Sequence, residues 1–147
     1  MRAITLLAFL LIAYTSPSLA ALGGSLEQFD SDGTPVTAST SSAVSNYVLH
    51  DTTLTSGTHV REYVSGNGVV FAIVWAGPVL PNLKALLGSY FNMMVNESRR
   101  KPRPGNSHMA VNRTDVVINS GGHMRDFEGS AWIPADFPDG FTADNVH

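Results

Sequence analysis

Glu62 is the residue of this sequence that is hardest to place as an ordinary surface side chain. It stands in the run Val60-Arg61-Glu62-Tyr63-Val64, which is typical of a β-strand. Because side chains alternate between the two faces of a strand, Glu62 shares a face with Val60 and Val64. If that face meets the core, the carboxyl group needs a charged or hydrogen-bonding partner, since a buried carboxylate without one takes up a proton. Glu62 then either fixes the strand register through its partner or anchors a binding pocket.

Three further residues complete the predicted ligand-binding set. His50 is the first candidate partner of Glu62, and Arg125 is the second. His123 follows Gly121-Gly122, where the lack of side chains lets a ligand approach the main chain closely, although two glycines are also typical of a turn or a bulge. The ligand-binding residues predicted from the sequence are therefore Glu62, His123, Arg125 and His50.

The sequence contains no pattern of a catalytic, metal or cofactor site. The five histidines lack the i, i+4 helical spacing of zinc ligands, and the chain has no cysteine. No Gly-x-Ser-x-Gly nucleophile elbow occurs, and the glycines before His123 have neither the lysine of a phosphate loop nor the Rossmann spacing. We therefore predict no catalytic residue, no metal site and no cofactor.

The beginning of the chain has the three parts of a signal peptide. Arg2 precedes an apolar run, Ala3 to Tyr14, which is too short to span a hydrocarbon core of about 30 Å. Pro17 interrupts this run, and Ser18-Leu19-Ala20 places small residues where a signal peptidase reads. We predict cleavage after Ala20, or one residue later. No later segment has membrane length, so the processed chain is expected in the periplasm or the medium, without a transmembrane segment.

Charge and cysteine content limit the class of partner. The net charge is −3, and a weakly acidic domain argues against nucleic acid. The exception is the basic run Arg99 to Arg103, which is either solvated or in contact with anionic lipid or cell-wall polymer. A chain without cysteine has no disulfides in an oxidising compartment, so packing alone must stabilise it. We expect the partner to be a protein or a small ligand of the cell envelope.

The strand of Glu62 is predicted to pair with the strand before it through the three-residue loop Thr55-Ser56-Gly57. This register sets Asp51 opposite Arg61 and His50 opposite Glu62, and both are favourable cross-strand pairs. A two-residue loop would set Asp51 opposite Glu62, where like charges repel. We therefore favour the first register.

The next strand and a helix are predicted to form the core. Val69 to Trp75 is apolar at every position, so this strand should be central in the sheet and covered on both faces. Asn82 is a candidate N-cap for an amphipathic helix that runs to about Asn96. We expect the helix to pack on the strand face with the larger side chains, which is Phe71, Ile73 and Trp75 rather than Val70, Ala72 and Val74.

Short apolar runs after the helix add further strands, at 109–111, 116–118 and 124–127, with another candidate at 131–133. The predicted fold class is α+β, an antiparallel sheet of five or six strands (β-meander, helix, further strands) with one amphipathic helix packed on one face. The predicted organisation is a signal peptide at 1–20, a flexible N-terminal lead-in at 21–45, a single α+β domain at 46–134 and a C-terminal tail at 135–147. The lead-in is rich in Ser, Thr and Gly and has few large apolar residues.

Several segments of the chain, from the leader to about Pro134, resemble domain-of-unknown-function family 2844, small exported proteins of Gram-negative bacteria. The most specific is Gly121-Gly122-His123-Met124-Arg125, and the start of the predicted mature chain, Ala21-Leu22-Gly23-Gly24, is also typical. The others are Ser56-Gly57-Thr58, Val60 to Val64, Gly68 to Phe71, Trp75 to Pro78, Leu83 to Leu87 and Tyr90-Phe91. The resemblance implies export and a compact single domain. It implies no activity and so transfers no catalytic residue.

These observations favour an exported non-catalytic protein that binds a partner or a small ligand in the periplasm or at the cell surface. The alternative is a small hydrolase that acts on cell-envelope material, with His123 and Glu62 as the acid–base residues. A cleft that brings Glu62, His123 and Arg125 together would favour the enzyme or a ligand site at these residues. Their separation on different surfaces would favour an interaction module.

The processed chain should begin at Ala21. Mass spectrometry of the protein recovered from the periplasm is expected to show this N-terminus, because Ser18 and Ala20 suit a signal peptidase. An intact Met1 on the exported protein would refute the leader assignment.

Overall fold

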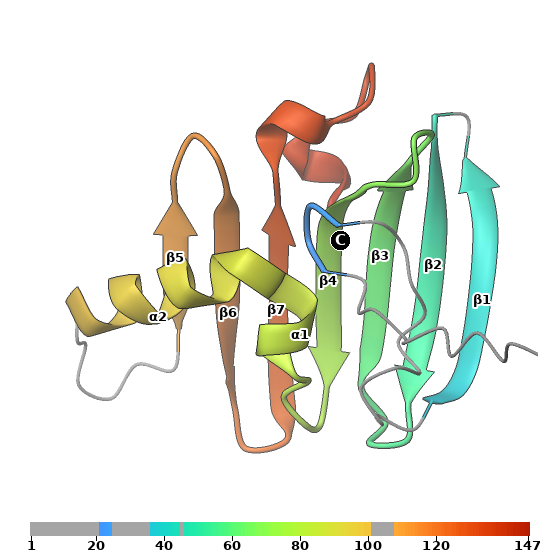
Figure 1. The fold of residues 1–147 in the computed structure, drawn as a ribbon. Helices are drawn as coiled ribbons and strands as arrows, with labels where there is room; N and C mark the ends of the chain where they lie inside the picture. The colour runs from blue at the N-terminus through green and yellow to red at the C-terminus, as the bar shows by residue number, and fades with distance from the viewer. Residues whose placement is uncertain (1–20, 25–35, 45, 101–107) are drawn as a thin grey trace, which may run out of the picture.

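An antiparallel sheet forms the framework of the molecule, with seven strands in the order β1-β2-β3-β4-β7-β6-β5 (Figure 1). The computed structural model describes residues 21–24, 36–44, 46–100 and 108–147, so the predicted signal peptide lies outside the described residues. The α+β class is confirmed, but the sheet has seven strands instead of the five or six predicted. The strands are β1 Val36–Val44, β2 Tyr47–Leu54, β3 His59–Ser65, β4 Val70–Gly77, β5 Met109–Asn112, β6 Val117–His123 and β7 Asp126–Trp132.

Two strands differ from the prediction, and β1 is the one that adds to the count. β1 lies in the segment predicted to be a flexible lead-in, and it pairs with β2 from Ala38 opposite Thr53 to Val44 opposite Tyr47. Its Ser, Thr and Ala residues show no apolar alternation, so the sequence pattern did not reveal a strand that its main-chain pairing defines. The runs predicted at 124–127 and 131–133 both overlap a single strand, β7, which begins at Asp126 and ends at Trp132.

The first hairpin has the register that the sequence predicted. Asp51 lies opposite Arg61, and His50 lies opposite Glu62. Gly57 closes the turn in the left-handed region at φ +84°. β4, the strand that is apolar throughout, lies at the centre of the sheet between β3 and β7, as predicted.

Gly121 and Gly122 lie inside β6 and not in a turn. The turn between β6 and β7 falls at Met124-Arg125, because His123 pairs with Asp126. Gly122 has φ +126°, and a Cβ there would lie 2.3 Å from the main-chain oxygen of Asp126. Glycine at this position therefore lets β6 and β7 pair closely.

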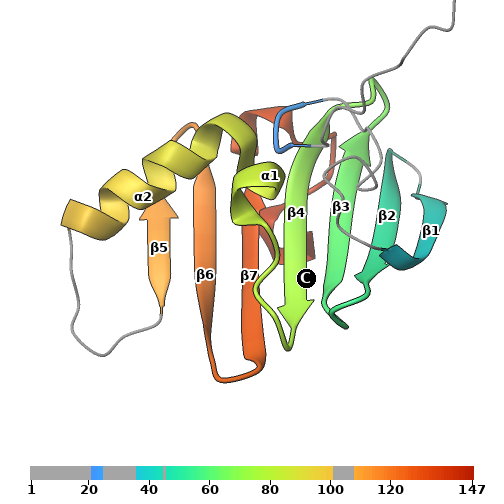
Figure 2. The same cartoon turned by 60° about the horizontal axis from the view of Figure 1, so that its bottom comes forward.

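A helical segment crosses one face of the sheet, with α1 over β4 and β7 and α2 over β6 and β5 (Figures 1 and 2). It consists of α1 Leu83–Leu87, a 3₁₀ turn at Gly88–Tyr90 and α2 Phe91–Arg100. Asn82 is the N-cap, as predicted, and its side-chain oxygen accepts a hydrogen bond from the Ala85 N–H at 3.2 Å. The segment ends at Arg100, beyond the predicted Asn96, and residues 101–103 of the basic run lie outside the described residues. Within the described ranges, no helix is long and apolar enough to cross a membrane.

A β-bulge in β4 decides which of its side chains face the helix. The register between β3 and β4 shifts between Tyr63 and Val64, so that Phe71 is an additional residue on β4. Phe71 packs with Tyr63 on one face of the sheet, whereas Ile73 and Trp75 pack on the face with the helix. The prediction that Phe71 shares the helix face is therefore wrong, because the bulge interrupts the alternation.

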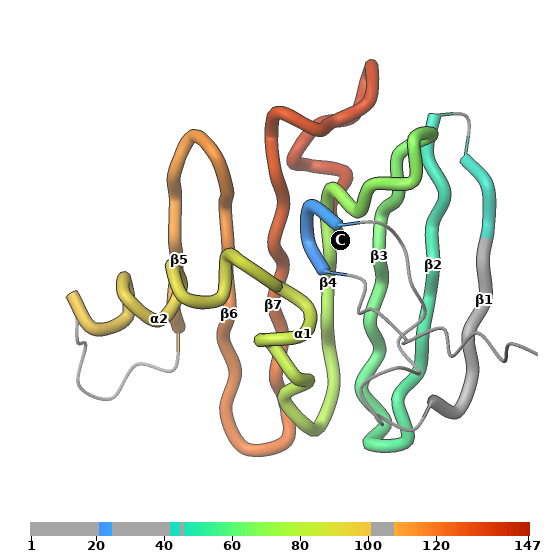
Figure 3. Tube along the Cα trace, viewed as in Figure 1, coloured from blue at the N-terminus to red at the C-terminus, as the bar shows by residue number. Residues whose placement is uncertain are grey.

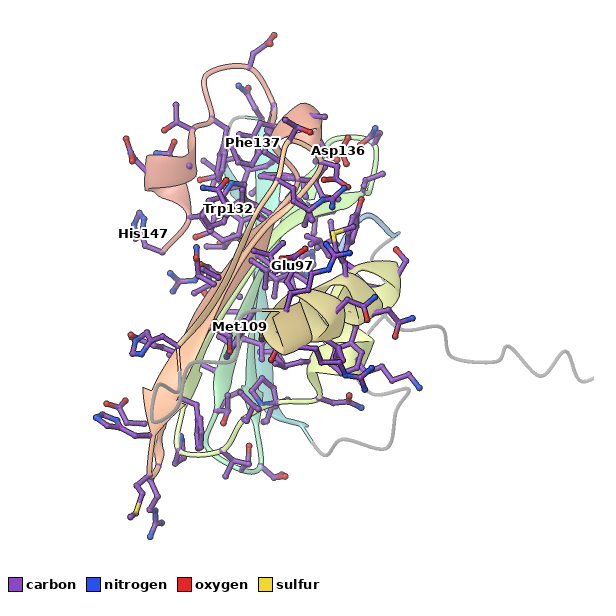
Figure 4. All side chains as sticks on the ribbon, turned by 90° about the vertical axis from the view of Figure 1, so that its left-hand side faces the viewer. Glu97, Met109, Trp132, Asp136, Phe137 and His147 are labelled. Atoms are coloured by element: carbon purple, nitrogen blue, oxygen red, sulfur yellow. The ribbon has the colours of Figure 1, made fainter. Side chains whose placement is uncertain are left out.

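The face opposite the helix is covered in part by the C-terminal segment, residues 134–147, which Figure 4 shows on the other side of the sheet from the helix. Phe137 and Phe141 of this segment pack edge to face against Phe71, with ring centroids 5.9 and 4.9 Å away. The hydroxyl of Tyr63 donates a hydrogen bond to the main-chain oxygen of His147 at 2.8 Å. This segment therefore supplies much of the apolar packing on that face.

Residues 21–24, which follow the predicted cleavage position, lie beside β4 (Figure 3). Leu22 is 2% exposed, and its N–H donates to the main-chain oxygen of Leu86 at 2.9 Å. The N–H of Gly23 donates to the main-chain oxygen of Val70 at 2.8 Å. These contacts connect the start of the predicted mature chain to both α1 and β4.

Replacing Leu87 with Ala should reduce the free energy of unfolding by about 2–5 kcal/mol, because its side chain is fully buried between helix and sheet. Lys84→Ala, on the exposed side of α1, is the control and should change the free energy by less than about 0.5 kcal/mol. Denaturant unfolding measures both. Similar small effects of the two changes would contradict the packing of α1.

Candidate functional site

An open groove of about 390 Å³ lies on the sheet face opposite the helix, beside the C-terminal segment. It extends across β4, β7, β6 and β5, and Val146 of the C-terminal segment contributes to its lining. Its other lining residues are Val74, Trp75, Ala76, His108, Met109, Ala110, Asn119, Ser120, Gly121, Glu128, Gly129 and Ser130.

Small residues in two neighbouring rows of the sheet form the floor of the groove. In the first row, the register aligns Val74 with Ser130 and Ser130 with Asn119, which pairs with Ala110. In the second row, Ala76 lies opposite Glu128, and Glu128 lies opposite Gly121. Most of these side chains are short, so the floor of the groove is low compared with its edges.

Because Gly121 has no side chain, it leaves space for the His108 side chain at the side of the groove next to β5. The imidazole of His108 lies over it, and a Cβ on Gly121 would be 2.7 Å from Cδ2 of His108. Any larger residue would have to displace the imidazole. The pair Gly121-Gly122 thus has two separate packing roles, one toward His108 and one toward β7.

The polar groups of the groove stand at its edge. Glu128, Asn119 and His108 are exposed, and no ion pair within the described ranges involves Glu128. His123 lies two residues beyond Gly121 on β6 and so points to the same side of the sheet. The described residues include no group of three or more His, Asp or Glu side chains that could hold a metal ion. The groove offers a carboxylate, an amide and an imidazole above a floor of small residues, an arrangement suited to holding a ligand.

The structure separates the four residues predicted to bind a ligand. Glu62 and His50 lie opposite each other on the helix side of β3 and β2. His123 lies on the other side of the sheet, and β3 and β6 are three strand spacings apart, about 14 Å. Arg125 lies in the exposed turn after β6, with φ +68°. Only His123 is therefore close to the groove.

Glu62 is buried but does not have the predicted partner. Its side chain is 3% exposed, and Oε1 has no hydrogen-bond partner. His50 lies opposite it in the sheet, yet neither His50 nor Arg125 forms a described hydrogen bond or ion pair with it. Burial raises the pKa of the Glu62 carboxyl to about 8 and lowers the pKa of His50. Glu62 is therefore protonated in the folded protein at neutral pH.

Arg61 and Tyr63, which flank Glu62, bind the C-terminal segment that contributes Val146 to the groove. The sequence did not indicate this role. Arg61 forms the predicted ion pair with Asp51 at 3.2 Å, and its Nη1 also donates to the main-chain oxygen of His147 at 2.8 Å. Tyr63 donates to the same oxygen and accepts from the His147 N–H at 3.2 Å. These bonds fix the segment that contains Val146. Because the partners are far apart in the sequence, no local pattern predicts them.

Raising the pH should destabilise the protein through Glu62. Its pKa is about 8 in the folded state, against 4.5 for an exposed glutamate. Between these values the folded state keeps a proton that the unfolded state has lost. The free energy of unfolding therefore falls as the pH rises through this range, with a limiting slope of about 1.4 kcal/mol per pH unit.

Glu62→Gln cannot ionise and should flatten this pH profile, as measured by denaturant unfolding at several pH values between about 5 and 9. Glu62→Ala should be less stable than Glu62→Gln, because it leaves a cavity. Glu128→Gln, at an exposed position, is the control and should keep the slope of the original protein. An unchanged slope in Glu62→Gln would show that Glu62 is not protonated in the folded state.

The comparisons with known proteins assign the chain to a family without assigning an activity. No curated protein and no solved structure matches it significantly. One family model, described as a protein of unknown function (DUF2844), matches residues 18–146, which include β1 to β7, the helical segment and all residues of the groove. The chain therefore belongs to the DUF2844 family of proteins of unknown function.

Proposed function

We propose that this protein is an exported, non-catalytic binding protein of the periplasm or cell surface, and that the groove holds a small ligand. The observation on which the proposal rests is the groove of about 390 Å³, whose floor consists mostly of small residues. A volume of this size suits a small molecule. Export rests on the signal-peptide pattern of residues 1–20.

The charges and surfaces of the groove indicate the chemistry of the ligand. Val74 and Val146 give it apolar contacts, while Glu128 supplies a carboxylate without a described ion pair. The nearby positive charge of Arg61 is already paired with Asp51. A slender, partly apolar molecule with an amine or hydroxyl donor for Glu128 fits this arrangement.

The hydrolase alternative receives less support from the geometry. An acid–base pair must reach the same bond of one substrate, within hydrogen-bond distance or through one water. Glu62 is buried on the helix side of the sheet, whereas His123 is on the groove side. This separation favours a binding role.

Blocking the groove should abolish ligand binding without unfolding the protein. Asn119→Trp places a large side chain at an exposed position of the groove, and Asn92→Trp makes the same change at an exposed position of α2. The three proteins, isolated with their native processing from the cell envelope, are compared by native mass spectrometry. We expect a bound small molecule on the original protein and on Asn92→Trp, and a loss of at least about tenfold in occupancy on Asn119→Trp.

Two results would overturn the proposed function. One is a folded Asn119→Trp protein that retains the molecule as well as the control does. The other is chemical conversion of the captured molecule during incubation with the original protein, which would identify a catalyst instead of a binding protein.

A further inference from the structure

The two edges of the sheet differ in length. β5 forms one edge with four residues, and β1 forms the other with nine. Within the described ranges β1 pairs only with β2, so one row of its main-chain N–H and C=O groups faces away from the sheet. Another strand can add to the sheet by hydrogen bonding to such a row of main-chain groups.

β1 lacks most of the features that prevent edge strands from pairing. Its sequence, Val-Thr-Ala-Ser-Thr-Ser-Ser-Ala-Val, contains no charged residue and no proline. The strand has one irregularity at its start, between Val36 and Ala38, and pairs regularly with β2 from Ala38 to Val44. The regular part is therefore available for a second ladder on its free side.

The order of residues in β1 is close to symmetric about Thr40. In an antiparallel pair of two copies centred there, Thr40 meets Thr40 and Ser39 meets Ser41. Ala38 then meets Ser42, so that small residues face each other across the regular part of the strand. A two-fold interface requires a surface that complements itself, and this sequence meets that requirement without placing like charges opposite each other.

We propose that β1 pairs antiparallel with β1 of a second copy of this chain, centred on Thr40, so that the two seven-stranded sheets continue into one. Opposite residues of an antiparallel pair point to the same face, so the two-fold axis is perpendicular to the sheet. Both helical segments then lie on one side, and both grooves open on the other. The proposal does not depend on the proposed ligand, since β1 contributes no residue to the groove.

Single cysteines test the pairing directly, because the chain has none of its own. Opposite Cα atoms in an antiparallel pair are about 4.5–5.5 Å apart, within the range that a disulfide spans. Thr40→Cys should therefore form a disulfide-linked dimer under mild oxidation. Thr114→Cys, at an exposed position between β5 and β6, should remain monomeric on a non-reducing gel.

Lysine substitutions supply a second measurement that does not depend on oxidation. Thr40→Lys would place two positive charges opposite each other and should weaken dimerisation at least about tenfold in analytical ultracentrifugation. Thr114→Lys should leave it unchanged, and circular dichroism would verify that each variant is folded. The proposal is overturned if the unmodified protein is monomeric at about 100 µM. It is also overturned if a dimer forms in which Thr114→Cys forms the cross-link and Thr40→Cys does not.

Discussion

Both faces of β4 have to be covered, and this constraint arranges the rest of the molecule. The helix covers Ile73 and Trp75 on one face, and the C-terminal segment covers Phe71 on the other. The aromatic contacts of Phe137 and Phe141 reach Phe71. Toward the end of β4, this face carries the smaller side chains of Val74 and Ala76, and the neighbouring strands include Ser130 and Gly121. This part of the face therefore exposes less apolar surface that would have to be buried. The groove lies there, where the C-terminal segment ends.

The sequence predicted the elements that local chemistry specifies. A glycine turn and two charge-compatible pairs defined the β2–β3 register, and the side chain of Asn82 marked the start of α1. What it did not predict depends on contacts across the fold. The bulge at Phe71 depends on the pairing of β3 with β4, and β1 is defined by main-chain bonds to β2. The bonds of His147 to Tyr63 connect residues with a sequence separation of 84.

The candidate site shows the same division. Alternation along β3 was enough to predict that Glu62 is buried, because its neighbours Val60 and Val64 are buried on the same face. Alternation does not show what lies across from a side chain, and the predicted hydrogen bond from His50 is not formed. The groove was not predicted because its floor consists of residues such as Ala76, Ser130 and Gly129. Residues of this kind have no distinctive pattern in a sequence, and only the register of four strands assembles them.

The run Gly121-Gly122-His123-Met124-Arg125 illustrates how a distinctive sequence can combine packing with a site. Gly122 allows the main chain of β7 to approach, and Gly121 leaves room for the ring of His108. A β-strand with two adjacent glycines is weakened by their conformational freedom. Gly122 is nevertheless needed here, because a Cβ would collide with the main chain of β7, whereas a Cβ at Gly121 would require the imidazole of His108 to shift. Since one of these contacts forms the hairpin and the other positions a groove residue, this hairpin couples the pairing of β6 and β7 to the shape of the groove.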